Sequence, residues 1–343
     1  MAYFLKEPHA QNDDTRTRIG ILLINLGTPS APTPKAVRAY LGEFLSDTRV
    51  IEIPRLLWWF ILNGVILPIR AKQSAKKYAA IWQEESSPLL YHTHLQTEHL
   101  NAYLATHGHS DIIIDYAMRY GHPSIESVIA RMRAHHVDRL LAVPLYPQYA
   151  ASSSGSALDQ VFRVLMKIRN MPEIRTVRHF YDHPGYIKAL ALSVTEYWTH
   201  HGRPDKLVIS FHGLPKFTQR LGDPYHKECQ RTGQLLANAI GLSSDEYCIT
   251  FQSRFGKTEW LKPYTSDVLS MLGRTPIRTV HVICPGFVSD CLETLEEIAI
   301  EGKQTFLSNG GQDYHFIPCL NQHPLWIEAL ANIVENQLSG WIA

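Results

Sequence analysis

The chain has 343 residues, with 33 basic and 32 acidic side chains, so its formal net charge is only +1. This balance argues against nucleic acid or a strongly acidic macromolecule as partner. Five scattered cysteines without a CxxC pair argue against a disulfide framework or a structural zinc site, and they fit a reducing cytoplasm.

Apolar strand-like runs alternate with amphipathic helical stretches along the chain. Residues 1–17 lack the apolar core of a secretory signal and are predicted to form a flexible tail. Strands are predicted at 19–27, 111–120, 139–147, 206–212, 247–251, 279–287 and 313–318. Helices are predicted at 33–45, after Ser124, after the loop 150–156, from about Asp223, from Pro263, from Ser289 and at 324–338.

This alternation predicts an α/β fold with parallel sheets covered by helices on both faces. Two such series indicate two doubly wound, Rossmann-like halves, at 18–172 and 173–320, with an active-site cleft between them. Residues 321–343 are expected to pack back on the first half. In such folds ligands bind beyond the carboxyl ends of the strands.

One apolar strand ends in a histidine. In VISFHGLP (208–215) the strand runs into His212, and Gly213 and Pro215 suit a sharp turn. Either this imidazole bonds a loop, or it faces the cleft and takes a proton or binds a metal ion.

An acidic series follows the strand 279–287. Glu293, Glu297 and Glu301 recur every four residues, which on an α-helix places them on one face. A solvated surface explains most such stripes. A helix that begins at a strand's carboxyl end would, however, direct its first carboxylates toward a ligand. Carboxylates and an imidazole suit ferrous iron or a similar divalent ion.

Two loops carry further polar groups. In PLYPQYAASSSGSA (144–157), the serine hydroxyls either bind an anion at the next helix or cap that helix, and the tyrosines pack around them. FQSRFGKT (251–258) ends like a P-loop but lacks its first glycine. Since no GxGxxG follows a strand either, nucleotide chemistry is disfavoured.

The longest apolar run, LLWWFILNGVILPI (56–69), is too short to span a bilayer and contains Asn63-Gly64 and Pro68, which we expect to break it. It forms either a core helix or an exposed lip for a flat apolar ligand. Arg70 follows at once and suits a carboxylate at the edge of such a ligand. We also expect weak peripheral membrane contact through this lip.

Together these segments resemble the ferrochelatase family from about Gly20 to the C-terminus. The motifs that carry the resemblance are NLGTP (25–29), RY (119–120), YPQY (146–149), SFHGLP (210–215), GDPY (222–225), FQSRFG (251–256), EWLKPYT (259–265) and DCLETLEEI (290–298). The segment 17–70 looks most like gamma-proteobacterial enzymes. The resemblance implies a lyase that inserts ferrous iron into protoporphyrin IX, the final step of haem synthesis.

The resemblance also implies roles for residues. His212 and Glu293 match the catalytic pair, and Glu297 and Glu301 match an acidic path that supplies metal to it. The residues expected to contact porphyrin are Leu26, Arg70, Tyr78, Ser87, Arg119, Tyr120, Tyr146, Ser152, Ser153 and Trp260. Asp290 is a further expected site residue. The sequence leaves open which of His212 and Glu293 accepts the protons and which of them first binds iron.

No permanently bound cofactor is expected, and iron is a substrate. Family members with a [2Fe–2S] cluster carry cysteines near the C-terminus, where this chain has none, and Ala151 stands where a thiol often follows YPQY. The expected location is the cytoplasm, peripherally at the inner membrane, with an upstream protoporphyrinogen oxidase as candidate partner. The alternatives are a coproporphyrin or cobalt chelatase, and a tetrapyrrole carrier without catalysis.

Overall fold

The computed structural model describes residues 4–5, 18–256 and 258–342. Its contacts divide the chain into two compact units, which are described one at a time. The first unit comprises Met1–Leu145, Ala151–His179 and Leu330–Ala343, and the second comprises Tyr146–Ala150 and Phe180–Ala329.

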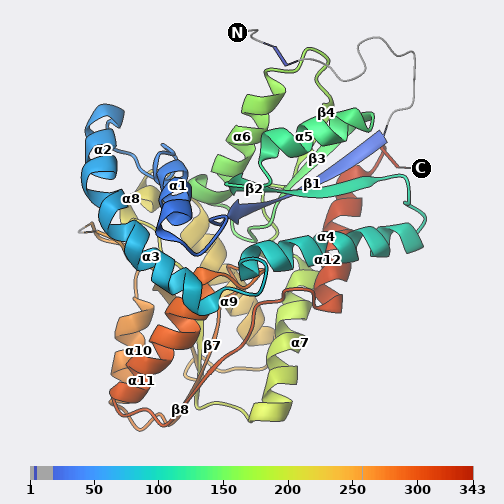
Figure 1. Cartoon of the computed structure of the whole chain (residues 1–343). Helices are drawn as coiled ribbons and strands as arrows, with labels where there is room; N and C mark the ends of the chain where they lie inside the picture. The colour runs from blue at the N-terminus through green and yellow to red at the C-terminus, as the bar shows by residue number, and fades with distance from the viewer. Residues whose placement is uncertain (1–3, 6–17, 257, 343) are drawn as a thin grey trace. The chain divides into compact units, whose positions relative to one another are not determined.

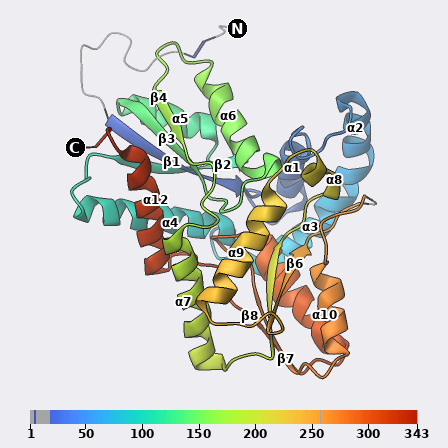
Figure 2. The ribbon, with the colours of Figure 1, turned by 180° about the vertical axis from the view of Figure 1, so that it is seen from behind.

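The first unit is built on a four-stranded parallel sheet. Its strands are β1 (Arg18–Gly27), β2 (Ile113–Tyr120), β3 (Val137–Pro144) and β4 (Glu173–Thr176), in the order β2-β1-β3-β4. Side chains 21–24 of the central strand β1 are fully buried, because helices cover both faces of the sheet. Figures 1 and 2 show α5 (Ile125–Ala134) and α6 (Ser156–Leu165) on one face and α4 (Pro88–Thr106) on the other.

Two helices of this unit begin at the caps that the sequence predicts. Thr33 Oγ1 accepts a hydrogen bond from the Ala36 N–H at the start of α1 (Pro34–Leu45), with Pro34 in the first turn. Ser124 Oγ accepts from the Ser127 N–H (3.2 Å) at the start of α5. These hydroxyls satisfy backbone donors that have no partner within the helix.

The apolar run 56–69 is not broken, contrary to our expectation. Helix α2 (Arg55–Ile61) continues through a π-helical turn, η1 (Leu62–Ile66), into α3 (Leu67–Ile81). In this turn the Leu67 N–H bonds the Leu62 carbonyl, five residues back. The wider turn lets the chain pass Pro68, which has no N–H to donate, without a break.

The second unit repeats the plan of the first. Its parallel strands are β5 (Lys206–His212), β6 (Tyr247–Gln252), β7 (Thr279–Ile283) and β8 (Asp313–Phe316), in the order β6-β5-β7-β8. Helices α7 (Pro184–His201) and α9 (Tyr225–Ala239) lie on one face, and α10 (Thr265–Gly273) and α11 (Lys303–Ser308) on the other (Figures 1 and 2). The predicted fold class, two parallel sheets flanked by helices, is therefore confirmed.

The remaining elements of the chain are shorter or lie beside these layers. They are the five-residue helix α8 (Lys216–Arg220), the π-helical segments η2 (Ala151–Gly155) and η3 (Glu293–Gly302), and α12 (Pro324–Leu338). The predicted tail at 1–17 lies mostly outside the described residues.

Several predicted boundaries were wrong. The strand expected to reach residue 287 ends at Ile283, and Pro285 cannot donate to a ladder. The helix expected from Pro263 begins at Thr265, because the Pro263 carbonyl instead accepts the Phe251 N–H of β6 (2.8 Å). Strand β4 and helices α4 and α7 were not predicted at all.

A buried histidine lies between α7 and the second sheet. The neighbours Val280 and Val282 on β7 pack into the opposite, apolar layer, so His281 faces α7, where Trp198 Nε1 donates to its Nδ1 (3.1 Å). Its ring lies 4.7 Å from that of His315, its register partner on β8. The pKa of His281 is lowered to about 4, mainly because the ring is buried and secondly because of the charge of His315.

The fold should therefore lose stability in mild acid. The pKa of His281 in the folded protein lies below its unfolded value of about 6.5, so between these values the unfolded chain binds the proton more readily. The folding free energy is therefore unaffected by this group above about pH 6.5, and stability is lost as the pH falls toward 4. We expect urea unfolding to show a loss of about 1 kcal/mol between pH 7.5 and 5.5 that is mostly absent in His281→Gln. Exposed His99→Gln on α4 serves as the control, and an unchanged pH dependence in His281→Gln would contradict this assignment.

Candidate functional site

His212 is the last residue of β5 and is half-buried. Its Nδ1 lies 2.7 Å from the Gly213 carbonyl oxygen. A carbonyl oxygen only accepts, so Nδ1 carries the proton and the lone pair of the neutral ring lies on Nε2. No residue in the described part of the chain bonds Nε2. The ring can therefore accept a proton or bind a cation through this atom.

The turn after His212 requires a glycine. The Gly213 N–H donates to the Gln252 carbonyl oxygen of β6 at 2.8 Å. A Cβ at Gly213 would lie 2.6 Å from that oxygen and 3.1 Å from the Trp260 ring. Any side chain would push the turn away from β6. The close approach therefore fixes the backbone beside His212.

The three acidic residues of the predicted stripe lie on η3, a π-helix rather than the expected α-helix. Its bonds span five residues, so each turn holds more residues than an α-helical turn, and carboxylates four apart stay on the same side. Glu293 and Glu297 are half-buried, whereas Glu301 is exposed. The stripe thus runs from the solvent inward, toward the start of the helix.

Two side chains from the sheet donate to the backbone of this helix. Gln252 Nε2 bonds the Glu293 carbonyl (2.9 Å), and Tyr314 Oη bonds the Ile298 carbonyl (2.6 Å). Gly302 lies against the same tyrosine, since a Cβ there would be 2.7 Å from Tyr314 Oη. The sheet therefore holds the helix at its first turn and at its middle.

Glu297 is held by Ser253, the first residue after β6. The Ser253 N–H donates to Glu297 Oε1 (2.6 Å), and the Ser253 hydroxyl donates to Oε2. Burial raises the pKa of Glu297. The Ser253 hydroxyl and the nearby charge of His212 oppose that rise, and Glu293 adds to it, so the net pKa is above its ordinary value. His212, Glu293 and Glu297 thus interact electrostatically.

Asp290 and Glu296 lie beside this group and are buried. Asp290 Oδ2 accepts from Asn321 Nδ2 (2.7 Å), and its Oδ1 accepts from the Thr294 hydroxyl (2.9 Å). These bonds fix the start of η3, which begins at Glu293 and not at Ser289 as expected. Asp290 is therefore bonded within the framework of the helix.

Arg119 and Tyr120, at the end of β2, form a buried network in the first unit. Arg119 donates to Asp47 Oδ2 (2.5 Å) and to Ser156 Oγ (2.8 Å), and Tyr120 Oη donates to the same Asp47 oxygen (2.9 Å). Burial opposes ionisation of Asp47. The bonds from Ser156, Arg49 and Tyr120 and the charge of Arg119 outweigh it and hold the pKa of Asp47 below its usual value. Burial raises the pKa of Tyr120.

Four more predicted residues belong to the first unit. Leu26 is half-buried at the end of β1, and its N–H donates to Asn25 Oδ1 (2.9 Å). Arg70 is half-buried on α3, where burial lowers the pKa of its guanidinium, and Tyr78 is buried on the same helix. Ser87 is buried and caps α4, since its Oγ accepts the Leu90 N–H (3.3 Å).

Ser152 and Ser153 are half-buried in η2, the π-helical turn before α6. This turn replaces the open loop that the sequence predicted. Tyr146 and Trp260 are half-buried residues of the second unit. The structure therefore groups His212, Glu293, Glu297 and Trp260 in that unit, and Arg119 and Tyr120 around Asp47 in the other.

Sequence reasoning missed Asp47, and it placed Gln252 and Ser253 at the carboxyl end of a strand without assigning them a role. The signal for Gln252 and Ser253 was available in FQSRFG, where polar residues follow directly after a buried strand. Among the described residues, no three His, Cys, Asp or Glu side chains are arranged to hold a metal ion.

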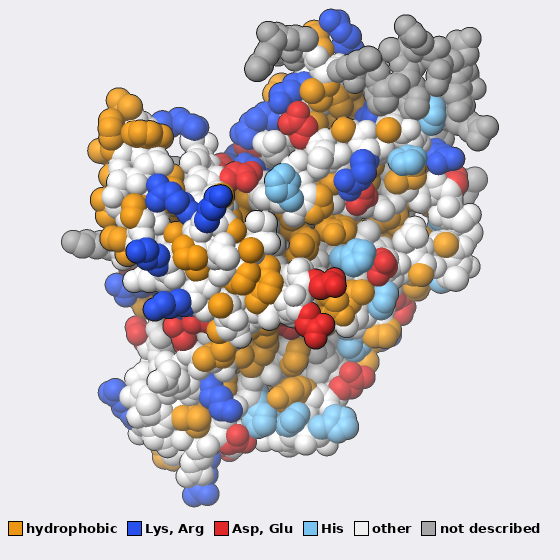
Figure 3. All heavy atoms as spheres, viewed as in Figure 1, with side chains coloured by type: hydrophobic (Ala, Val, Ile, Leu, Met, Phe, Trp, Pro, Cys, Tyr) orange, Lys and Arg blue, Asp and Glu red, His pale blue; other side chains and the backbone are white. Residues whose placement is uncertain are grey.

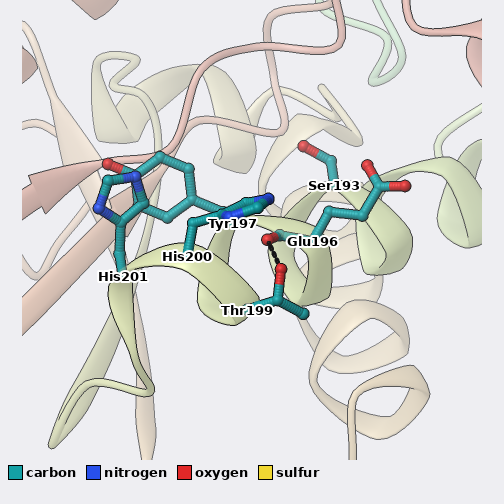
Figure 4. Close-up of a pocket in the computed structure, with 6 residues that line it drawn as sticks. All are labelled: Ser193, Glu196, Tyr197, Thr199, His200 and His201. Atoms are coloured by element: carbon teal, nitrogen blue, oxygen red, sulfur yellow. Dashed lines mark hydrogen bonds between the residues drawn. The ribbon is translucent and has the colours of Figure 1, made fainter.

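A pocket of about 440 Å³ lies elsewhere, on the surface of α7. Figure 4 shows its lining residues: Ser193, Glu196, Tyr197, Thr199, His200 and His201. One dashed line marks the Thr199 hydroxyl bonded to the Glu196 carbonyl (2.6 Å), a bond within the helix. The pocket contains none of the predicted site residues, and we assign it no role.

Comparison with known proteins gives a consistent result. The Ferrochelatase family model matches residues 18–338. A ferrochelatase of Chromobacterium violaceum is 63% identical over 341 residues, covering 99% of this chain and 93% of that protein. One of Nitrosomonas europaea is 56% identical, with the same coverage. These relatives are beta-proteobacterial, whereas the sequence led us to expect gamma-proteobacterial ones.

Solved structures show the same fold at low identity. SirB from Bacillus subtilis with Fe3+ has a TM-score of 0.57 at 14% identity and covers 95% of this chain and 98% of its own. CbiX, described as the terminal enzyme for siroheme biosynthesis in denitrifying bacteria, has a TM-score of 0.50 at 12% identity, covering 92% and 98%. No helix in the described ranges combines the length and apolar character needed to cross a membrane.

Proposed function

This chain belongs to the ferrochelatase family, and we infer that it inserts ferrous iron into protoporphyrin IX and releases protohaem, the last step of haem synthesis. Identities of 56 to 63% over almost the whole chain support this function. The reaction exchanges two pyrrole N–H protons for one divalent cation, so we class the enzyme as a lyase. We propose that iron and porphyrin are substrates and that no cofactor stays bound.

We propose His212 as the acceptor of the porphyrin protons. The observation that carries this assignment is the bond from Nδ1–H to the Gly213 carbonyl, which leaves the lone pair on Nε2. An imidazole with a free ring nitrogen can take up a proton there and release it again, which suits this proton transfer. The half-buried carboxylates of Glu293 and Glu297 would stabilise the imidazolium that forms.

We propose that the acidic stripe supplies the iron. Exposed Glu301 would receive the aqueous ion, and Glu297 and then Glu293 would carry it inward along η3. Carboxylate oxygens suit hard divalent cations, and a row of weak sites allows the ion to leave as well as to enter.

We propose that the predicted porphyrin residues fall into two classes. Arg119 and Tyr120 are already bonded to Asp47, so they would shape a wall rather than bind a propionate themselves. Arg70, on the exposed lip helix, is the stronger candidate for propionate pairing. The other proposed porphyrin contacts are Leu26, Tyr78, Ser87, Tyr146, Ser152, Ser153 and Trp260.

Loss of the imidazole should abolish metal insertion. We expect His212→Ala to lower kcat by about 100-fold or more, because it removes the proposed proton acceptor. Anaerobic assays with ferrous iron would measure this, with circular dichroism to show that the fold is intact. His99→Ala, on the exposed face of α4, is the matched control. Turnover near the wild-type value in folded His212→Ala would rule out this role.

Glu293→Gln should also impair the reaction, by at least about tenfold, because it removes the innermost charge of the stripe. Glu296 on the same helix is unsuitable as a control because that side chain is buried and its exchange would disturb packing. Glu328→Gln, exposed on α12, is a better control. Equal effects of the Glu293 and Glu328 exchanges would show that the stripe has been misassigned.

Arg70→Ala should raise the porphyrin KM by about fivefold, which is the effect of losing one hydrogen bond to a charged group at a half-buried position. Its kcat should change less, since propionate pairing is made equally in the ground state and the transition state. The iron KM should stay the same. Arg163→Ala, exposed on α6, is the control. A change confined to the iron KM would contradict our placement of the two substrates.

Protoporphyrin is the substrate that the lip favours. Protoporphyrin carries vinyl groups where coproporphyrin carries further propionates, and the lip exposes a large apolar surface. Assays with both porphyrins, and with ferrous iron and cobalt, would test this preference. The identity to ferrochelatases does not favour a non-catalytic carrier.

A protoporphyrinogen oxidase, which must supply the porphyrin, is the partner that we propose.

We propose that the lip also touches the membrane surface. Large apolar side chains of α2, η1 and α3 are half or more exposed: Leu56 74%, Leu57 56%, Trp59 58%, Phe60 61%, Val65 52% and Ile69 55%. Figure 3 shows orange side chains gathered over α2, with basic side chains nearby. Exposed Lys72 and Lys76 on α3 would complement anionic lipid.

Flotation with vesicles that contain anionic lipid would test this contact. The double exchange Leu57→Ser and Phe60→Ser should lower the bound fraction about tenfold, because each side chain contributes apolar area to the bilayer surface. Leu221→Ser, at a leucine of the second unit that is more exposed (74%) than Leu57, is the control. Equal flotation of the lip variant and the wild type would exclude the lip as the contact.

A further inference from the structure

We propose that Ser253 is a positioning residue for metal insertion, which holds the Glu297 carboxylate in the orientation that receives iron. The inference rests on the proposed role of Glu297 in the iron path. It is carried by the two bonds that Ser253 makes to one carboxylate and by the backbone conformation that allows both.

Ser253 contacts both oxygens of Glu297. Its backbone N–H donates to Oε1 at 2.6 Å, and its hydroxyl donates to Oε2. A carboxylate on a glutamate side chain normally rotates about its last bond. Two donors from one residue stop that rotation and leave the other lone pairs of the two oxygens in fixed directions. Glu297 therefore presents one defined face to a cation.

The backbone of Ser253 makes this arrangement possible. Its φ is +63°, the left-handed region that non-glycine residues adopt rarely and mostly at sites where the surroundings impose it. In this conformation the N–H and the side chain of one residue reach the same partner. A glycine would adopt the backbone more easily, so the serine is present at a conformational cost.

The residue before Ser253 anchors it from the other side. Gln252 is buried, and its Oε1 accepts from the Ser210 hydroxyl (2.7 Å), while its Nε2 holds the Glu293 carbonyl. Its own carbonyl oxygen accepts the Gly213 N–H next to His212. Ser253 is thus attached to a strand end that also fixes the backbone beside His212. Its two bonds to Glu297 therefore hold that carboxylate in a fixed position relative to the same strand end.

The decisive variant is Ser253→Gly, which is compatible with the left-handed backbone, keeps its N–H and removes the hydroxymethyl side chain. We expect the KM for ferrous iron to rise about tenfold, the effect of losing one hydrogen bond to a charged group. The porphyrin KM and the kcat at saturating iron should stay within about twofold of the wild type. Ser253→Ala should show the same iron effect with an unfolding midpoint below that of Ser253→Gly, because the Cβ of alanine strains this left-handed backbone.

A double-mutant cycle with Glu297→Gln separates positioning from a merely structural role. If Ser253 acts through Glu297, the double variant Ser253→Gly/Glu297→Gln has the same iron KM as Glu297→Gln alone. Additive effects of the two exchanges would overturn the proposal. His136→Gly is the matched control, because His136 has the same backbone conformation (φ +64°) in the first unit and is not a site residue.

The cycle also separates this inference from the proposed iron path. If Glu297→Gln raises the iron KM but Ser253→Gly leaves it within twofold of the wild type, the positioning role is wrong and the path stands. If Glu297→Gln leaves the iron KM unchanged, the path itself is wrong. A rise in the porphyrin KM in Ser253→Gly, without one for iron, would also overturn the positioning role.

Discussion

The arrangement of the second unit depends on the hydrogen bond between the Gly213 N–H and the Gln252 carbonyl. At 2.8 Å it joins the end of the strand that carries His212 to the end of β6. From β6 two further attachments reach η3, through the Gln252 amide and through Ser253. If a side chain at Gly213 separated the two strand ends, the imidazole and the carboxylates would lose their common support. This is why the turn after an apolar strand holds a glycine.

Much of this could be predicted from the sequence because the relevant signals are local. Strand ends were visible as apolar runs that stop at polar residues, and Gly213 was visible as a turn residue. The helix type was not visible, since a spacing of four between Glu293, Glu297 and Glu301 suits an α-helix and a π-helix alike. The choice depends on donors distant in the sequence, such as Tyr314, which bonds Ile298 from the next strand.

Partners were harder to predict than residue types. RY at 119–120 stood out as a polar pair after a strand, and a role at a porphyrin was the natural interpretation. The Asp47 carboxylate that both side chains bond lies 72 and 73 positions away in the chain. A buried guanidinium needs such a carboxylate because its charge is otherwise too costly to bury. The sequence shows that Arg119 needs a partner, and only the fold shows which one.

In the proposed mechanism, the two demands of the reaction fall to different elements of the second unit. A proton acceptor must keep one fixed nitrogen free, and His212 does so because a rigid strand and a neighbouring carbonyl hold its ring. A metal path instead needs several equivalent weak ligands in a row, which a helix supplies by repetition at a constant spacing. Coordinating the two requires that the helix not move relative to the strand. The buried amide of Gln252, bonded to Ser210 on one side and to Glu293 on the other, meets that requirement without a charge of its own. A neutral amide is suited to this position because a charged group there would compete with the arriving cation or repel it.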